Sequence, residues 1–162
     1  MASTENPAVR RTRGAHQWLA LLVGIVFLAV GVWGFARTGF DGLTDPDALT
    51  ATEGPTLLWF TVNPLHNIVH VVVGVLGLLL WAASATARVY GWLLFLGYGA
   101  VFVYGLFAVG NPDVDLLHLN QADNWLHLAA AVVGLVIAVL PRPRPRAARP
   151  APGARPAPGV RP

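Results

Sequence analysis

Residues 63–80 read NPLHNIVHVVVGVLGLLL, a short polar start followed by ten purely apolar positions. Asn63 can cap a helix, and Pro64 fits the first helical position, where the missing N–H costs no hydrogen bond. The apolar run continues to Ala83, so the segment reaches the roughly 20 residues that a helix needs to cross a bilayer. We therefore expect a membrane-spanning helix whose first turns carry His66 and His70.

The chain contains three further apolar runs of similar length, one before this run and two after it. Helices buried in a soluble protein usually keep one polar face, whereas these runs hold polar side chains only at their ends or on narrow seams. Hydrophobic residues make up 55% of the 162 residues and charged residues only 12%. The predicted fold is an all-α, integral membrane four-helix bundle. Its spans are expected at residues 18–35, 64–83, 89–109 and 124–140.

The basic residues lie almost entirely on one side of these spans. All 11 are arginine, and only Arg37 falls in the two loops opposite the chain ends. Because cytoplasmic segments are enriched in arginine, both termini are predicted to be cytoplasmic. The chain then divides into a cytoplasmic tail at 1–15, a transmembrane domain at 16–140 and a second cytoplasmic tail at 141–162. The first span is interpreted as an uncleaved anchor in a multi-pass protein of the bacterial plasma membrane.

The last 22 residues form a low-complexity segment rich in proline and arginine, in which ARPAPG occurs twice. Proline at this density excludes a helix and favours an extended chain, so we expect a disordered tail. Arginines beside an apolar span suit the anionic lipids of a cytoplasmic leaflet. We expect the lipid bilayer and anionic lipids as partners, and no nucleic acid.

Two of the spans begin with the same polar motif. When Asn67 is aligned with Asn124, each is followed by histidine three positions later (His70 and His127), then by a small residue and by a Gly-Leu pair. These offsets all fall on one helical face. Because both helices would enter from the outer side, the pattern predicts two helical hairpins arranged as a parallel repeat. We expect His70 and His127 to face each other near the outer surface, with the asparagines orienting the imidazoles.

This polar set has two readings that the sequence leaves open. In the structural reading, its members hydrogen-bond between helices and hold them in register. In the ligand reading, His66 and His70 bind one ion at i, i+4 spacing and His127 supplies a third ligand. Asp123 would then support the ligands as a hydrogen-bond partner that does not itself bind the ion. The set comprises His66, Asn67, His70, Asp123, Asn124 and His127.

Several functional classes are excluded by what the spans and loops lack. No Asp, Glu or Arg lies in the middle of a span, which argues against an ion path, and no phosphate-binding or nucleophile motif occurs. Our first hypothesis is a non-catalytic packing or assembly protein, acting with a membrane-protein partner or as a homo-oligomer and needing no cofactor. The alternative is a small redox or sensor protein that binds a metal or haem through His66, His70 and His127.

The run at 63–80, taken with ADNWLHLAAAVVGL at 122–135, resembles a family of small actinobacterial membrane proteins catalogued as domain-of-unknown-function family number 4383. The resemblance covers residues 16–140 and implies four membrane helices in a bacterial plasma membrane. It implies no activity, substrate or cofactor. The positions that match the polar signature of the family are Asn63, His66, Asn67, His70, Asp123, Asn124 and His127.

Overall fold

The computed structural model describes residues 12–49 and 55–141, and these residues are mostly helical. The four long helices are α1 (Ala15–Thr38), α3 (Pro64–Leu80), α4 (Ser84–Ala108) and α5 (Gln121–Val139). Each overlaps one of the four predicted apolar runs. Compared with the predicted spans, α1 is three residues longer at each end, α3 ends three residues earlier, and α4 and α5 begin five and three residues earlier. The proposed disorder and lipid binding of the C-terminal tail lie outside the described residues and stay predictions.

The helix ends follow from local sequence. Gly39 and Gly110, with φ of +74° and +81°, adopt the left-handed backbone after α1 and α4, which glycine tolerates without strain. Only residues 81–83 separate α3 from α4, so these two helices must run antiparallel. The N-termini of α3 and α5 are capped by asparagine side chains, as described below.

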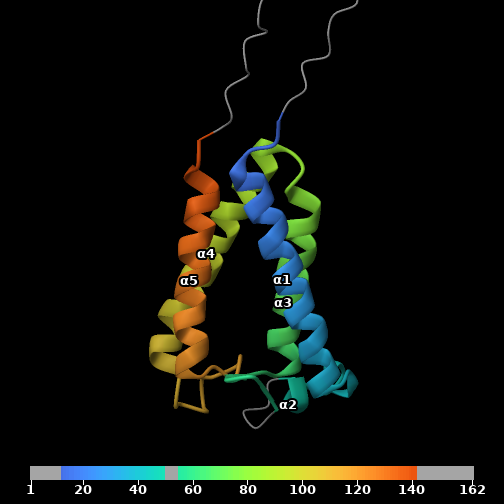
Figure 1. The fold of residues 1–162 in the computed structure, drawn as a ribbon. Helices are drawn as coiled ribbons and strands as arrows, with labels where there is room; N and C mark the ends of the chain where they lie inside the picture. Colours follow the sequence, from blue (N-terminus) through green and yellow to red (C-terminus); the bar gives the residue numbers. More distant parts are fainter. Residues whose placement is uncertain (1–11, 50–54, 142–162) are drawn as a thin grey trace, which may run out of the picture.

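The helices pack as two pairs, α1 with α3 and α4 with α5 (Figure 1). Glycines allow this close approach: a Cβ at Gly24 of α1 would come within 2.9 Å of the Gly77 backbone in α3. Gly91 of α4 and Gly134 of α5 meet in the same way, since a Cβ on either would lie 2.8 Å from the carbonyl oxygen of the other. In a membrane such contacts supply the dispersion energy that holds helices together.

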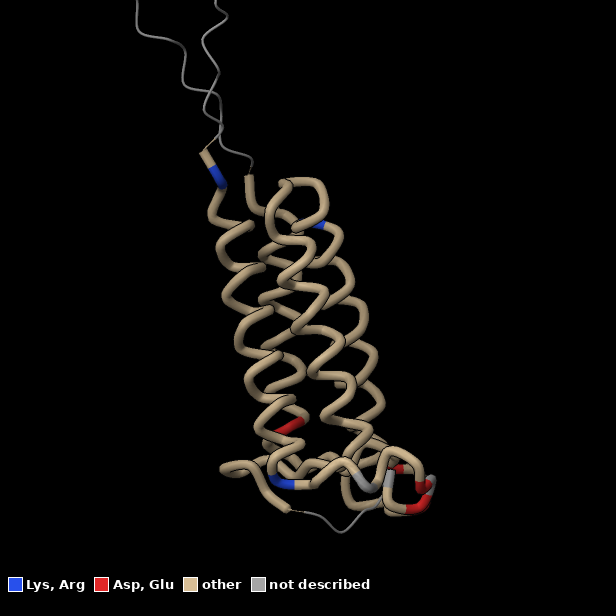
Figure 2. Tube along the Cα trace, turned by 90° about the vertical axis from the view of Figure 1, so that its right-hand side faces the viewer, with Lys and Arg blue, Asp and Glu red and all other residues tan. Residues whose placement is uncertain are grey.

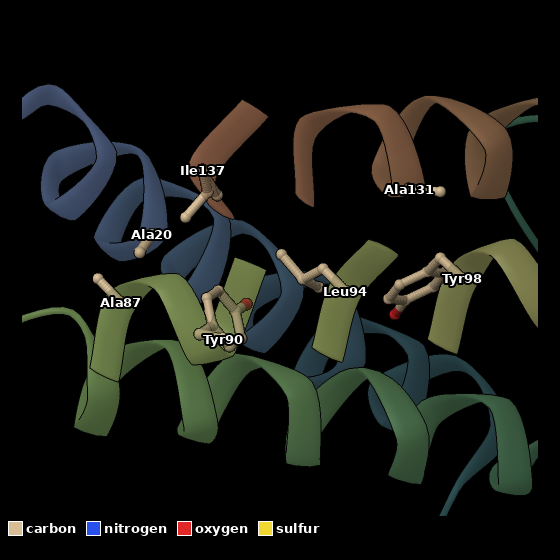
Figure 3. Close-up of a cluster of buried hydrophobic side chains, with 7 residues drawn as sticks. All are labelled: Ala20, Ala87, Tyr90, Leu94, Tyr98, Ala131 and Ile137. Carbon is tan, nitrogen blue, oxygen red and sulfur yellow. The ribbon is translucent and has the colours of Figure 1, made fainter. Parts of the chain in front are cut away.

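The two pairs meet through a small apolar core. It contains Ala20 of α1, four residues of α4 and two of α5: Ala87, Tyr90, Leu94, Tyr98, Ala131 and Ile137. Figure 3 shows Ala20, Ala87 and Ile137 gathered at one end of this core, with Tyr98 and Ala131 further along the bundle. The start of α1 and the end of α5 lie at the same end of the molecule (Figure 1).

Short elements close the opposite end of the bundle. They are a 3-10 turn at Asp41–Leu43, helix α2 (Pro46–Leu49) and strands β1 (Thr56–Leu57) and β2 (Phe60–Thr61). The strands pair antiparallel, with Thr56 opposite Thr61 and Leu57 opposite Phe60. The apolar periodicity of the sequence did not predict these elements, because they are too short to show a period.

The outer surface of the bundle is apolar, the reverse of a soluble protein. Leu79, Leu96 and Val132 are 70%, 63% and 52% exposed. Charged residues of the described chain lie near the two ends of the helices and not along their length (Figure 2). Helices α1, α4 and α5 are long and apolar enough to cross a membrane, whereas α3 has 17 residues and is shorter.

Candidate metal centre

The first turns of α3 and α5 are built by the same device. Asn63 accepts a hydrogen bond from the His66 backbone N–H at 2.8 Å, and Asn120 accepts one from the Asp123 backbone N–H at 2.9 Å. Asn63 therefore caps α3 as predicted, with Pro64 at the first position. Asn120 was missed by the sequence analysis, although it lies at the same 57-residue interval that relates Asn67 to Asn124.

The position of α5 that is equivalent to His66 of α3 carries a different residue. Position 123 carries aspartate, and its carboxylate accepts the backbone N–H of Asn120 at 3.3 Å, which completes a capping box. Asp123 is buried, with 1% of its surface exposed. Its partners are the backbones of Asn120, at the end of α5, and of Thr61 in β2, so no hydrogen bond among the described residues supports the proposal that it backs a histidine ligand.

Asn67 and Asn124 lie against glycines of the neighbouring helix within each pair. A Cβ on Gly34 of α1 would collide with the Asn67 amide, and a Cβ on Gly105 of α4 would collide with the Asn124 amide. The Asn67 amide nitrogen donates to Thr38 Oγ1 at 3.0 Å. The structure gives no hydrogen bond between these amides and the imidazoles among the described residues, so the prediction that they orient the rings is not supported.

The three histidines of the predicted set come together inside the bundle. The ring centroids of His66 and His70, one turn apart on α3, are 4.5 Å apart, and those of His66 and His127 are 5.8 Å apart. One nitrogen from each ring can be chosen so that all three lie within 4.8 Å of one another. The side chains are 2%, 5% and 3% exposed for His66, His70 and His127.

Several nitrogens in this cluster have no hydrogen-bond partner of ordinary length and angle among the residues that the structure describes. They are both ring nitrogens of His66 and the Nδ1 atoms of His70 and His127. A buried polar atom without a partner costs free energy, so native interiors contain few of them. A metal ion would use one such lone pair from each ring.

Two aromatic residues enclose the histidines. Tyr98 of α4 stacks on His127, with ring centroids 5.4 Å apart and planes at 29°, and Phe27 of α1 lies 5.3 Å from the His70 ring. Phe27 and Tyr98 also stack on each other at 5.0 Å. No sequence pattern distinguished these two, because aromatic residues within apolar helices are ordinary. Each of the four long helices thus contributes at least one ring to the cluster.

The arrangement has the chemistry of a small transition-metal site. Neutral imidazole suits zinc, copper, iron and nickel, and sites with three histidines leave a further coordination position open. The other two histidines of the chain lie outside the group: His16 bonds to Ser84 at 2.9 Å at the end where α1 begins, and His118 lies in the loop before α5.

Apolar helices with a buried polar cluster at one end fit the class of helical integral membrane proteins. The family model described as domain of unknown function (DUF4383) matches residues 17–140 of the chain. The chain belongs to this family, as the motifs at 63–80 and 122–135 predicted. No curated protein and no solved structure matches the chain.

Proposed function

We propose that this protein binds a single transition-metal ion through His66, His70 and His127 within the membrane domain. The observation that carries the proposal is the convergence of three buried ring nitrogens within 4.8 Å, drawn from two helix pairs. The role is that of a metal-binding sensor or redox protein, with no catalytic step assigned.

The unpaired nitrogens favour this function over a purely structural one. If the histidines served only to hold helices in register, their nitrogens would be expected to donate to or accept from groups on the facing helices. Instead, among the described residues no hydrogen bond of ordinary length and angle reaches either nitrogen of His66, and its nearest polar neighbour is the backbone of Leu117 in the loop before α5. The close packing of Phe27 and Tyr98 on the histidine rings also favours a bare ion over a haem, whose macrocycle would need that space.

The proposal includes a topology. All four long helices span the plasma membrane, with α3 the shortest at 17 residues, and both termini are cytoplasmic. The pairs α1–α3 and α4–α5 form a parallel repeat about an axis along the membrane normal, which is supported by equivalent caps and by the equivalent asparagine–glycine contacts. The metal site then lies near the outer end of the bundle.

Metal binding can be tested on the full chain purified in detergent. We expect about one equivalent of Zn²⁺ or Co²⁺ to bind, with Co²⁺ giving the visible d–d absorption of a site of low coordination number. Single substitutions of His66, His70 and His127 with Gln should each abolish this absorption. His16→Gln serves as the matched control, because His16 lies at the other end of the bundle and should leave binding unchanged.

The outcomes distinguish a metal-binding role of the histidine cluster from a packing role. Loss of binding in the three cluster variants and retention in His16→Gln supports the metal site. Absence of stoichiometric binding by the wild-type chain, or equal binding by all four variants, contradicts it and returns the cluster to a packing role.

A further inference from the structure

The two helix pairs approach each other differently at the two ends of the bundle. Near the start of α1, Ala20 and Ala87 are fully buried and belong to one core with Ile137, so small side chains let the pairs come close. Figure 1 shows the pairs close together at this end and spread apart toward the opposite end. The helices of the two pairs therefore approach each other most closely at this end.

At the spread end, the space between the pairs is bridged by rings and not by backbone contact. In the described chain, the backbones of α3 and α5 do not pack closely on each other. The rings of His66 on α3 and His127 on α5 nevertheless meet, with centroids 5.8 Å apart. Nearer the middle of the bundle, Phe27 of α1 and Tyr98 of α4 stack between the two pairs. Two of the three metal ligands belong to one pair and the third to the other.

In a coordinated metal site the ligand nitrogens lie closer together than the 4.8 Å limit found for the three histidines here. With metal–nitrogen bonds of about 2.0–2.1 Å, two ligands of a tetrahedral ion lie about 3.4 Å apart. The three nitrogens here lie within 4.8 Å. His66 and His70 share a helix and His127 stands on α5, so whatever closure the rotation of the rings does not supply must change the distance between α3 and α5.

The loops at this end connect each pair to the other. The Asn63 amide, from the cap of α3, donates to the Leu116 carbonyl oxygen at 3.0 Å, and the Asn120 amide, from the cap of α5, donates to the Trp59 carbonyl oxygen at 2.8 Å. Each cap therefore holds the loop that precedes the other helix. A shift of α5 relative to α3 would move both loops, including Trp59, which is 76% exposed.

We infer that the bound ion acts as a clamp between the two helix pairs, so that metal occupancy sets their separation at the outer end and the position of the loops above it. This inference rests on the proposed metal site and adds its regulatory consequence. The ion draws His127 toward His66 and His70, while the small-residue contact at the other end acts as the fixed point.

Distances between spin labels test the clamp in the full chain reconstituted in liposomes. The sequence contains no cysteine, so label pairs can be introduced without background. Val32→Cys with Phe107→Cys reports on the outer end, at positions 58% and 73% exposed, and Leu22→Cys with Leu93→Cys reports on the other end, at 57% and 51%. Both pairs connect α1 with α4.

Addition of Zn²⁺ should shorten the mean outer distance by about 1–2 Å and narrow its distribution, as the closure of the ligand set requires. The inner pair should not change, and His127→Gln in the outer-pair background should remove the response. Stoichiometric zinc binding with an unchanged outer distance overturns the clamp and leaves the metal site standing. If no zinc binds to the labelled wild-type chain, the proposed function fails and the clamp with it.

Discussion

At the level of single residues, the unpaired imidazole nitrogens determine how the cluster should respond to substitution. Burying a polar atom without a partner costs roughly 1–3 kcal/mol, whereas replacing it with an apolar group of similar shape is often neutral or stabilising. His70 has an Nδ1 without a partner among the described residues, and its ring contacts the rings of Phe27 and His66. The effect of an apolar residue there should therefore depend on whether metal is present.

We expect His70→Leu to unfold at the same or a higher denaturant concentration than the wild type when both are metal-free. With zinc at 100 times its dissociation constant, only the wild type should gain stability, by about 2.7 kcal/mol. Unfolding curves in mixed detergent, monitored by circular dichroism with and without zinc, measure the metal-free stability and the gain in stability from zinc. A loss of about 1–2 kcal/mol in the metal-free variant would instead indicate that His70 hydrogen-bonds to protein groups.

The affinity for metal should also depend on pH, because a ligand must lose its proton before it can bind. Protons therefore compete with the ion for the rings in acid, and burial, which disfavours the charged imidazolium, moves this competition to lower pH than for an exposed histidine. We expect zinc affinity to be nearly constant above about pH 6.5 and to fall only in more acidic solution. Titrations followed by calorimetry would show this, and an affinity that rises with acidity would exclude histidine ligation.

At the level of helices, the packing within each pair depends on glycines that face the asparagines. In α4, a Cβ at Gly105 would collide with the Asn124 amide, whereas a Cβ at Gly97 would meet open space. Gly105→Ala should therefore destabilise the protein by about 1–3 kcal/mol through overpacking. Gly97→Ala should be neutral or stabilising by up to about 1 kcal/mol, because alanine is the better helix former. Equal unfolding midpoints for the two variants would contradict this contact.

The helices show what the sequence could and could not predict. Apolar length predicted four helices, and the i, i+4 spacing of His66 and His70 predicted a shared face, because both follow from local geometry. The 57-residue repeat also pointed to His127 as their partner. The direction of Asn67 toward Thr38, and the rings of Phe27 and Tyr98 around the cluster, depend on which helices become neighbours. No local pattern contains that information.

At the level of the whole molecule, the proposed orientation determines which compartment supplies the metal. Arg13 and Arg88 lie at the starts of α1 and α4, at one end of the described bundle. The segments that connect α1 with α3 and α4 with α5 lie at the other end and contain Asp45, Asp47, Asp113 and Asp115, and Arg37 lies in the last turn of α1. His66 lies three residues after Asn63, at the end with the acidic loops. If arginines mark the cytoplasmic side, an ion reaches the site from outside without crossing the bilayer.

The orientation can be tested in intact cells with single cysteines and a membrane-impermeant maleimide. Ala48→Cys and Val114→Cys, in the loops at the end that carries the histidine cluster, should react. Ala2→Cys and Ala83→Cys should react only after the cells are permeabilised, because the positive-inside rule places them in the cytoplasm. Cysteine is absent from the natural sequence, so the unsubstituted chain is the background control. Labelling of Ala83→Cys in intact cells, with protection of Val114→Cys, would place the metal site on the cytoplasmic side and make the cytoplasm its source of ions.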